Sequence, residues 1–124
     1  MSEYEHFSDR ELQCSCCGKL NPHKRFKELM LDVVDLRKWY GKPMRVTSAY
    51  RCSQHPIEVK KLGIGEHTRG AIDLQVPVED CYKIVKKAFS MGCFSGIGIN
   101  LKGDPSKRFI HLDNRSENPR IWSY

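Results

Sequence analysis

The 124-residue sequence has no long apolar run, no repeat and no tract of biased composition. No stretch approaches the roughly 18–20 apolar residues that a membrane-spanning helix needs, so we expect no membrane span. The first nine residues, MSEYEHFSD, are polar and acidic, and they lack the basic start and apolar centre of a secretory signal. We therefore expect synthesis in the cytoplasm without a signal peptide. A substrate outside the membrane would then require a separate route of release.

The sequence also lacks a concentrated basic tract, although its net charge is +6. The densest groups of basic residues are Lys60-Lys61 and Lys86-Lys87, with no arginine-rich or aromatic-interleaved stretch of the kind that binds nucleic acid. No nucleic-acid partner is expected. The dispersed charge suits either adsorption to an anionic bacterial wall or simple solubility. The length predicts a single domain over residues 1–124, and we expect a monomer.

Cysteine is plentiful, at positions 14, 16, 17, 52, 81 and 93. An even number suggests disulfides in small secreted proteins, but this chain is long enough to build a core and lacks a signal, which favours reduced thiols. Cys81 falls at a core position of a predicted helix. A structural zinc site that joins Cys14, Cys16 and Cys17 to Cys52 is a second interpretation. Against it, C-x-C-C is not the usual paired C-x-x-C, and a fourth ligand would be distant.

Two segments have helical periodicity. In residues 24–40 apolar side chains recur every three or four positions, from Phe26 to Trp39 and Tyr40, and Gly41 ends the helix. Residues 78–91 form the second predicted helix, with Gly92 as its stop. Residues 1–23 look irregular, with one short turn of capping-box type at residues 8–11.

Four segments are typical of strands, and residues 51–66 between them are typical of a loop. The predicted strands are 44–50, 71–76, 95–100 and 108–114. In chain order the elements are helix, strand, strand, helix, strand, strand. This order favours the α+β class, with a small antiparallel β-sheet and flanking helices.

Three residues could hold a catalytic zinc ion. Such a site needs three protein ligands of the histidine or carboxylate type and one open position. His67 and Asp73 are six positions apart, and His111 follows in the last predicted strand. Antiparallel neighbours would place these side chains on one face. His6, His23 and His55 lie outside such patterns and are interpreted as ordinary surface or core residues.

Together, these motifs resemble a known family over residues 7–124. They are Ser48-Ala-Tyr50-Arg51, His67-x-x-Gly70-Ala71-x-Asp73, Gly96-Ile-Gly98 and Phe109-Ile-His111-Leu-Asp113. Their order is similar to that of the LAS zinc metallopeptidases, named for lysostaphin, D-Ala-D-Ala peptidases and the sonic hedgehog domain. The D-Ala-D-Ala carboxypeptidase branch, with its murein endopeptidases and phage endolysins, is the most similar. The resemblance implies a hedgehog/D-Ala-D-Ala peptidase-like fold and Zn²⁺ held by His67, Asp73 and His111.

The chain departs from the family pattern in two places. The family has seven positions from the first histidine to the aspartate, whereas this chain has six, and counting back seven from Asp73 reaches Glu66. We prefer His67 as the ligand because its H-x-x-G relation with Gly70 is intact. Some relatives also carry an acidic residue three positions before the last histidine, where this chain has Arg108.

The resemblance also implies roles for two catalytic residues. Arg51 matches the family arginine that faces the substrate carbonyl or carboxylate, a role that suits a planar, permanently charged group. Asp113 is the favoured general base, or else it orients His111 as a partner on the same strand face. Glu66 and Asp104 are the alternative bases.

These features predict a zinc peptidase that cuts peptidoglycan stem peptides, as a carboxypeptidase or an endopeptidase. The expected setting is a bacteriophage or prophage lysis enzyme, released with the help of a holin, or a wall-penetrating enzyme carried in a virion. The alternative is a zinc-containing module with weak or no catalysis that binds wall peptides or a protein partner. A nucleic-acid-binding zinc domain built on the cysteines is the least favoured interpretation.

Overall fold

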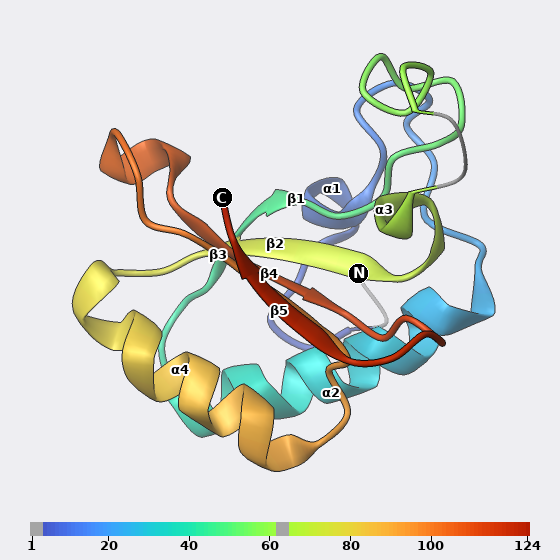
Figure 1. Ribbon diagram of the computed structural model, residues 1–124. Helices are drawn as coiled ribbons and strands as arrows, with labels where there is room; N and C mark the ends of the chain where they lie inside the picture. Colours follow the sequence, from blue (N-terminus) through green and yellow to red (C-terminus); the bar gives the residue numbers. More distant parts are fainter. Residues whose placement is uncertain (1–3, 62–64) are drawn as a thin grey trace.

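A five-stranded sheet runs through the centre of the computed structural model, which describes residues 4–61 and 65–124 (Figure 1). No helix in these two ranges is long and apolar enough to cross a membrane. In chain order the elements are α1 (Asp9–Leu12), α2 (Lys24–Tyr40), β1 (Arg45–Ser48), α3 (Glu66–Arg69), β2 (Ala71–Gln75), α4 (Val78–Met91), β3 (Gly96–Asn100), a 3₁₀ turn (Pro105–Lys107), β4 (Phe109–Asp113) and β5 (Arg120–Ser123).

The strand order in the sheet is β1-β2-β4-β3-β5. All neighbours are antiparallel except β3 and β5, which run parallel. The α+β class is therefore confirmed, whereas the expectation of an antiparallel sheet is wrong, because the sheet is mixed. The cause is the connection 114–119. It starts where β4 ends, beside the start of β3, and leads to the outer edge of β3, so β5 must run in the same direction as β3.

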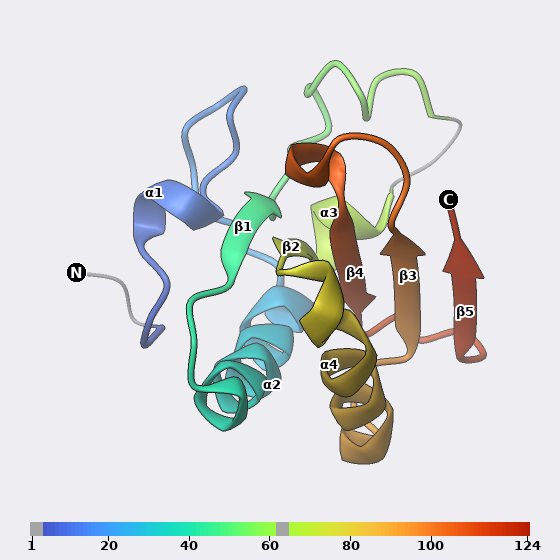
Figure 2. The ribbon, with the colours of Figure 1, turned by 90° about the vertical axis from the view of Figure 1, so that its left-hand side faces the viewer.

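Both long helices pack on the same face of the sheet (Figure 2). Their bounds match the predicted ranges 24–40 and 78–91, and each is followed by a glycine with positive φ, Gly41 and Gly92. Cys81 is buried, as predicted. Trp39 was expected to face the core but is 47 % exposed, and the ammonium group of Lys87 lies 5.4 Å from its ring centroid. This tryptophan bridges the outer surfaces of α2 and α4.

The remaining segments are single helical turns and turn-rich loops. The capping box is present, since the Ser8 and Glu11 side chains each bind the other's backbone at the start of α1. The predicted loop 51–66 is turn-rich over residues 51–61, and residues 62–64 lie outside the described ranges. Its last residue, Glu66, instead begins the helical turn α3. In Figure 1 residues 51–61 and the segment before α2 rise on the same side of the molecule as α3.

Candidate metal centre

Strand alternation separates the core of this protein from its site. Ile72 and Leu74 of β2 belong to the buried apolar core, together with Ile110 and Leu112 of β4. Because successive side chains of a strand point to opposite faces, the residues between them face away from the helices. Asp73 is one such residue, and His111 and Asp113 are two more.

Register then brings two of these side chains together. Asp73 and His111 are directly paired across β2 and β4, and His111 Nδ1 lies 2.9 Å from Asp73 Oδ1. A β-bulge at Thr47 in the neighbouring strand β1 keeps Ser48 opposite Asp73. The paired positions therefore form a fixed two-residue platform at the centre of the sheet.

The third member comes from α3 rather than from the end of a loop. His67 is buried in this single turn, and its Nδ1 lies 2.8 Å from the Ala49 carbonyl oxygen. That oxygen can only accept, so Nδ1 carries a proton and Nε2 is the nitrogen left to face the site. Nε2 points into the site, 3.2 Å from Asp73 Oδ1. A separation of six positions from His67 to Asp73 is enough because Gly70 alone separates α3 from β2.

The three side chains form a compact donor set. One ligand atom from each of His67, Asp73 and His111 lies within 4.8 Å of the others, and all three residues are buried. Two imidazoles and one carboxylate, with space left on one side, match the ligand set of catalytic zinc sites. Glu66 is not part of this set, since its carboxylate pairs with Arg25 at 2.7 Å.

Asp113 lies behind His111 and is fully buried. One of its oxygens accepts a hydrogen bond from His111 Nε2 at 2.7 Å. Arg115 binds the same carboxylate through Nη2 at 2.6 Å and Nε at 2.9 Å. The carboxylate is therefore fully engaged, and it leaves His111 Nδ1 as the nitrogen that faces Asp73.

The ionisation of this cluster follows from these hydrogen bonds. Burial opposes ionisation of Asp73, yet hydrogen bonds from His111 and His67 lower the pKa of its carboxyl to about 2. Burial also works against charging His111, but the carboxylates of Asp113 and Asp73 raise its pKa. A carboxylate that stays ionised is a ready ligand for a cation.

A cavity of about 320 Å³ opens onto the cluster. Its other lining residues are Arg51, Lys61, Glu66, Phe109, Arg115, Trp122 and Tyr124. Asp104 is not among them, because its side chain is exposed and caps the 3₁₀ turn through the Ser106 N–H. Of the three predicted bases, Glu66 therefore lines the cavity, Asp113 lies buried behind His111, and Asp104 lies elsewhere.

Arg51 reaches the cavity from the segment after β1. Its backbone N–H donates to the His67 carbonyl at 3.0 Å, which ties it directly to α3. Its guanidinium lies 3.1 Å from the buried carboxylate of Glu58, which also holds Lys61 at 3.0 Å. Sequence reasoning missed Glu58, because nothing in its neighbourhood suggests that this loop residue is buried.

The C-terminal strand β5 supplies the wall that sequence reasoning missed. The ring of Trp122 lies 5.2 Å from that of His111, and the Arg115 guanidinium lies 5.0 Å from the Trp122 centroid. Gly98 makes this contact possible, since a Cβ there would meet the Trp122 ring at 2.6 Å. Gly96 makes room for Asp113 in the same way. The Gly96-Ile-Gly98 motif is thus explained by close packing under the site.

Comparison with known proteins agrees with this geometry. The sequence profile of the peptidase M15 family matches residues 5–113. The chain belongs to the peptidase M15 family. This is a zinc D-Ala-D-Ala carboxypeptidase-like family, so the predicted resemblance and the predicted Zn²⁺ cofactor are both confirmed. No curated protein and no solved structure gives a significant match to this M15 peptidase.

Proposed function

We propose that this M15 peptidase hydrolyses peptide bonds in the stem peptides of bacterial peptidoglycan, with zinc held by His67, Asp73 and His111. The observation that carries the proposal is the convergence of these three buried donors at the base of a cavity that also holds Arg51. Membership of the M15 family supports metallopeptidase activity on peptidoglycan-like substrates. Which bond is cut, and whether the enzyme acts as a carboxypeptidase or an endopeptidase, is part of the test.

The residues around the zinc ligands keep the site in a metal-ready form. When bound, zinc lowers the pKa of water and polarises the scissile carbonyl. The Ala49 carbonyl accepts from His67 Nδ1, so Nε2 is the nitrogen that faces the ligand position. Asp113 accepts from His111 Nε2, so Nδ1 is the nitrogen that faces it. Each histidine therefore already aims one nitrogen at the site, and a metal ion would take the place of the proton that this nitrogen shares with Asp73.

Arg51 is positioned to bind the substrate. A guanidinium beside a scissile carbonyl stabilises the negative charge that develops on oxygen, and it can equally anchor a terminal carboxylate. Glu58 fixes the Arg51 side chain from behind at 3.1 Å, and Lys61 adds a second cation to the cavity wall. Cationic side chains in the cavity wall suit the anionic stem peptides of peptidoglycan.

We assign different roles to the two remaining carboxylates, Asp113 and Glu66. Asp113 is saturated by His111 and Arg115, so we assign it the positioning of His111. Of the three predicted bases, Glu66 is the one that lines the cavity, and we assign it the acceptance of the proton from water. Its ion pair with Arg25 at 2.7 Å holds the carboxylate in place at the cavity wall. Glu66→Gln keeps the shape of the side chain and removes the base, so it should lower kcat more than KM.

A binding module without catalysis is the second candidate. The observation that favours it is Arg108, which stands where some relatives carry an acidic residue and donates through Nε to the Gly103 carbonyl, away from the site. Such a module would retain zinc and bind wall peptides but release no products.

The decisive experiment is digestion of purified peptidoglycan by the native protein and by His67→Ala, with mass spectrometry of the released muropeptides. New peptide ends that appear only with the native protein support the proposal, and their masses identify the bond. Intact peptidoglycan from several wall types, together with bound zinc, would instead establish the binding module.

The biological setting we propose is bacteriophage lysis or wall penetration, by analogy with the endolysins in the same branch. Expression of the protein in a bacterial cytoplasm should be harmless alone and should lyse the cells when a holin is co-expressed. Lysis without the holin, or survival with it, would contradict the holin-dependent route.

A further inference from the structure

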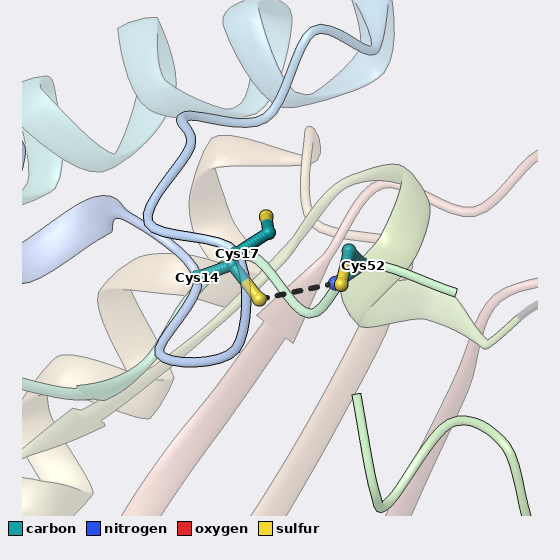
Figure 3. A group of neighbouring side chains, drawn as sticks. All are labelled: Cys14, Cys17 and Cys52. Carbon is teal, nitrogen blue, oxygen red and sulfur yellow. Dashed lines mark hydrogen bonds between the residues drawn. The ribbon is translucent and has the colours of Figure 1, made fainter. Parts of the chain in front are cut away.

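A second cluster of metal-binding side chains lies outside the peptidase site. The sulfur atoms of Cys14, Cys17 and Cys52 lie within 4.8 Å of one another, and no disulfide links the described cysteines. Figure 3 shows that the three side chains come from two segments far apart in sequence, the turn before α2 and the loop after β1. Packing can explain a single buried cysteine, but it does not explain why three thiols from two segments converge.

The turn that carries the first two cysteines is closed by the backbone. Cys14 N–H donates to the Lys19 carbonyl at 2.9 Å, and Gly18 N–H donates to the Cys14 carbonyl at 2.8 Å. Gly18 has φ +70°, a conformation that glycine adopts without strain. These backbone hydrogen bonds therefore fix the positions of Cys14 and Cys17 relative to each other.

The sulfur of Cys14 is surrounded by donors rather than acceptors. Its Sγ accepts the backbone N–H of Cys16 at 3.3 Å and that of Cys52 at 3.4 Å, and the second contact is the dashed line in Figure 3. Hydrogen bonds of this kind favour the thiolate, which is the form that binds metal. They also join the two segments directly.

Within the C-x-C-C segment, the two cysteines that join the cluster are spaced as C-x-x-C. Cys16 is not one of the three clustered cysteines. Its side chain is exposed, and its Sγ donates to the Gln54 carbonyl oxygen at 3.7 Å. The remaining pair, Cys14 and Cys17, has the two-residue separation that is usual in structural zinc sites. Cys52 and His55 repeat this separation, and His55 Nε2 lies 3.2 Å from the hydroxyl of Ser15, inside the first pair.

We propose that Cys14, Cys17 and Cys52 bind a second, structural zinc ion, with His55 as the fourth ligand. The site ties the turn before α2 to the loop after β1. Cys52 directly follows Arg51, whose backbone is bonded to His67 in α3. The structural ion therefore supports the segment that delivers Arg51 to the peptidase cavity, and it does so whatever that cavity's substrate is.

The test is zinc content, measured by mass spectrometry of metals, in the native protein and in matched cysteine variants. Native protein should carry about two zinc ions per chain. Cys17→Ser and Cys52→Ser should each lose one, whereas Cys93→Ser, which alters a half-buried cysteine outside the cluster, should lose none. X-ray absorption of His111→Ala should show sulfur at about 2.3 Å from zinc, because only the thiolate site remains loaded.

A second measurement covers variants that fail to fold. Replacing zinc by cobalt in the native protein should produce thiolate-to-cobalt charge-transfer absorption, which a nitrogen- and oxygen-only site cannot give. One zinc per chain that His111→Ala removes and Cys17→Ser leaves in place would overturn the proposal. A disulfide between two of the three cysteines, seen as a mass lower by two hydrogen atoms, would overturn it as well.

The fourth ligand has its own pair of variants. His55→Ala should weaken retention of the second zinc ion against a chelator, and Cys16→Ser should leave it unchanged. The reverse result would overturn the assignment of His55.

Discussion

Two clusters of metal-binding side chains, built in different ways, lie in this small protein. His67, Asp73 and His111 stand on a sheet and a helical turn, at the base of a cavity of about 320 Å³. Cys14, Cys17 and Cys52 stand on two turns held together by backbone hydrogen bonds. The first cluster has nitrogen and oxygen donors and space beside them, which suits catalysis, whereas the second has sulfur donors, which suit a closed structural site.

The difference lies in what fixes each donor. In the first cluster the Asp73–His111 pair is set by strand register, and each histidine is held from behind by an oxygen of Ala49 or Asp113. The peptidase site is therefore preformed by the fold. In the second cluster the donors sit on loop segments whose mutual position has no strand pairing to define it. We expect that cluster to depend on its metal, and the peptidase site to survive without one.

Metal removal should separate the two clusters most strongly. A mild chelator should strip the open His/Asp site first, so peptidase activity falls to background while the far-ultraviolet circular dichroism stays native. A thiol reagent that attacks Cys14, Cys17 and Cys52 should instead lower the melting temperature. Simultaneous loss of activity and fold at every chelator concentration would break the distinction between the two clusters.

Substitution of Arg51 should separate substrate binding from metal binding. Arg51→Ala removes a cation from the cavity and should lower kcat/KM by about 10²–10³-fold, as for the loss of one oxyanion donor. Zinc content should stay at the native value, because Arg51 is in neither cluster. Arg51→Lys, the matched control, should recover only part of the loss because it cannot bind bidentately. Loss of zinc in Arg51→Ala would contradict this, because it would show that the substitution disturbs the loop after β1 and not only the charge in the cavity.

Asp113 should affect one metal ion and not the other. Asp113→Asn keeps the shape of the side chain but removes the charge that fixes the His111 tautomer. We expect zinc affinity at the peptidase site to fall by about 10–100-fold. Retention by the cysteine cluster should be unchanged, which competition with a chromogenic chelator can measure. A pH–activity profile that loses its acidic limb, with zinc affinity intact, would return Asp113 to the role of general base.

Tyr40 lies in neither cluster, so its substitution should change stability without changing zinc content. Tyr40 at the end of α2 donates its hydroxyl to Asp80 on α4, and Tyr40→Phe should cost about 1 kcal/mol of unfolding free energy. Burial and the Asp80 carboxylate raise the pKa of Tyr40 to about 12. The stabilisation is therefore complete below the ordinary tyrosine pKa of about 10 and is lost as pH rises through about 12. Denaturant unfolding of both proteins between pH 8 and pH 12 should show the difference shrinking, with zinc content unchanged throughout.

How far the sequence predicts this molecule depends on whether a local pattern exists. The helices Lys24–Tyr40 and Val78–Met91 have clear periodicity and glycine stops, so their bounds could be predicted. Strand β5 could not, because Arg120–Ser123 is a short, mostly exposed edge strand without alternation between apolar and polar residues. Because β5 was not predicted, its parallel pairing with β3, which makes the sheet mixed, was not predicted either.

The two clusters differ in the same way. His67, Asp73 and His111 lie in a recognisable motif order, so sequence reasoning could name them. Their supports, Glu58 and Arg115, have no motif and are found only where tertiary contacts bury a charge. The Cys14–Cys17 pair was hidden by the intervening Cys16, although the Gly18 that follows it was an available signal of a tight metal-binding turn.

The peptidase centre is tested by measuring zinc content and muropeptide release together in His111→Ala and in native protein. We predict that His111→Ala loses one zinc ion per chain and releases no new peptide ends, while the native protein keeps that zinc ion and releases them. Unchanged zinc content in His111→Ala, or peptide release that persists without its histidine, would contradict the assignment of the peptidase centre to His67, Asp73 and His111.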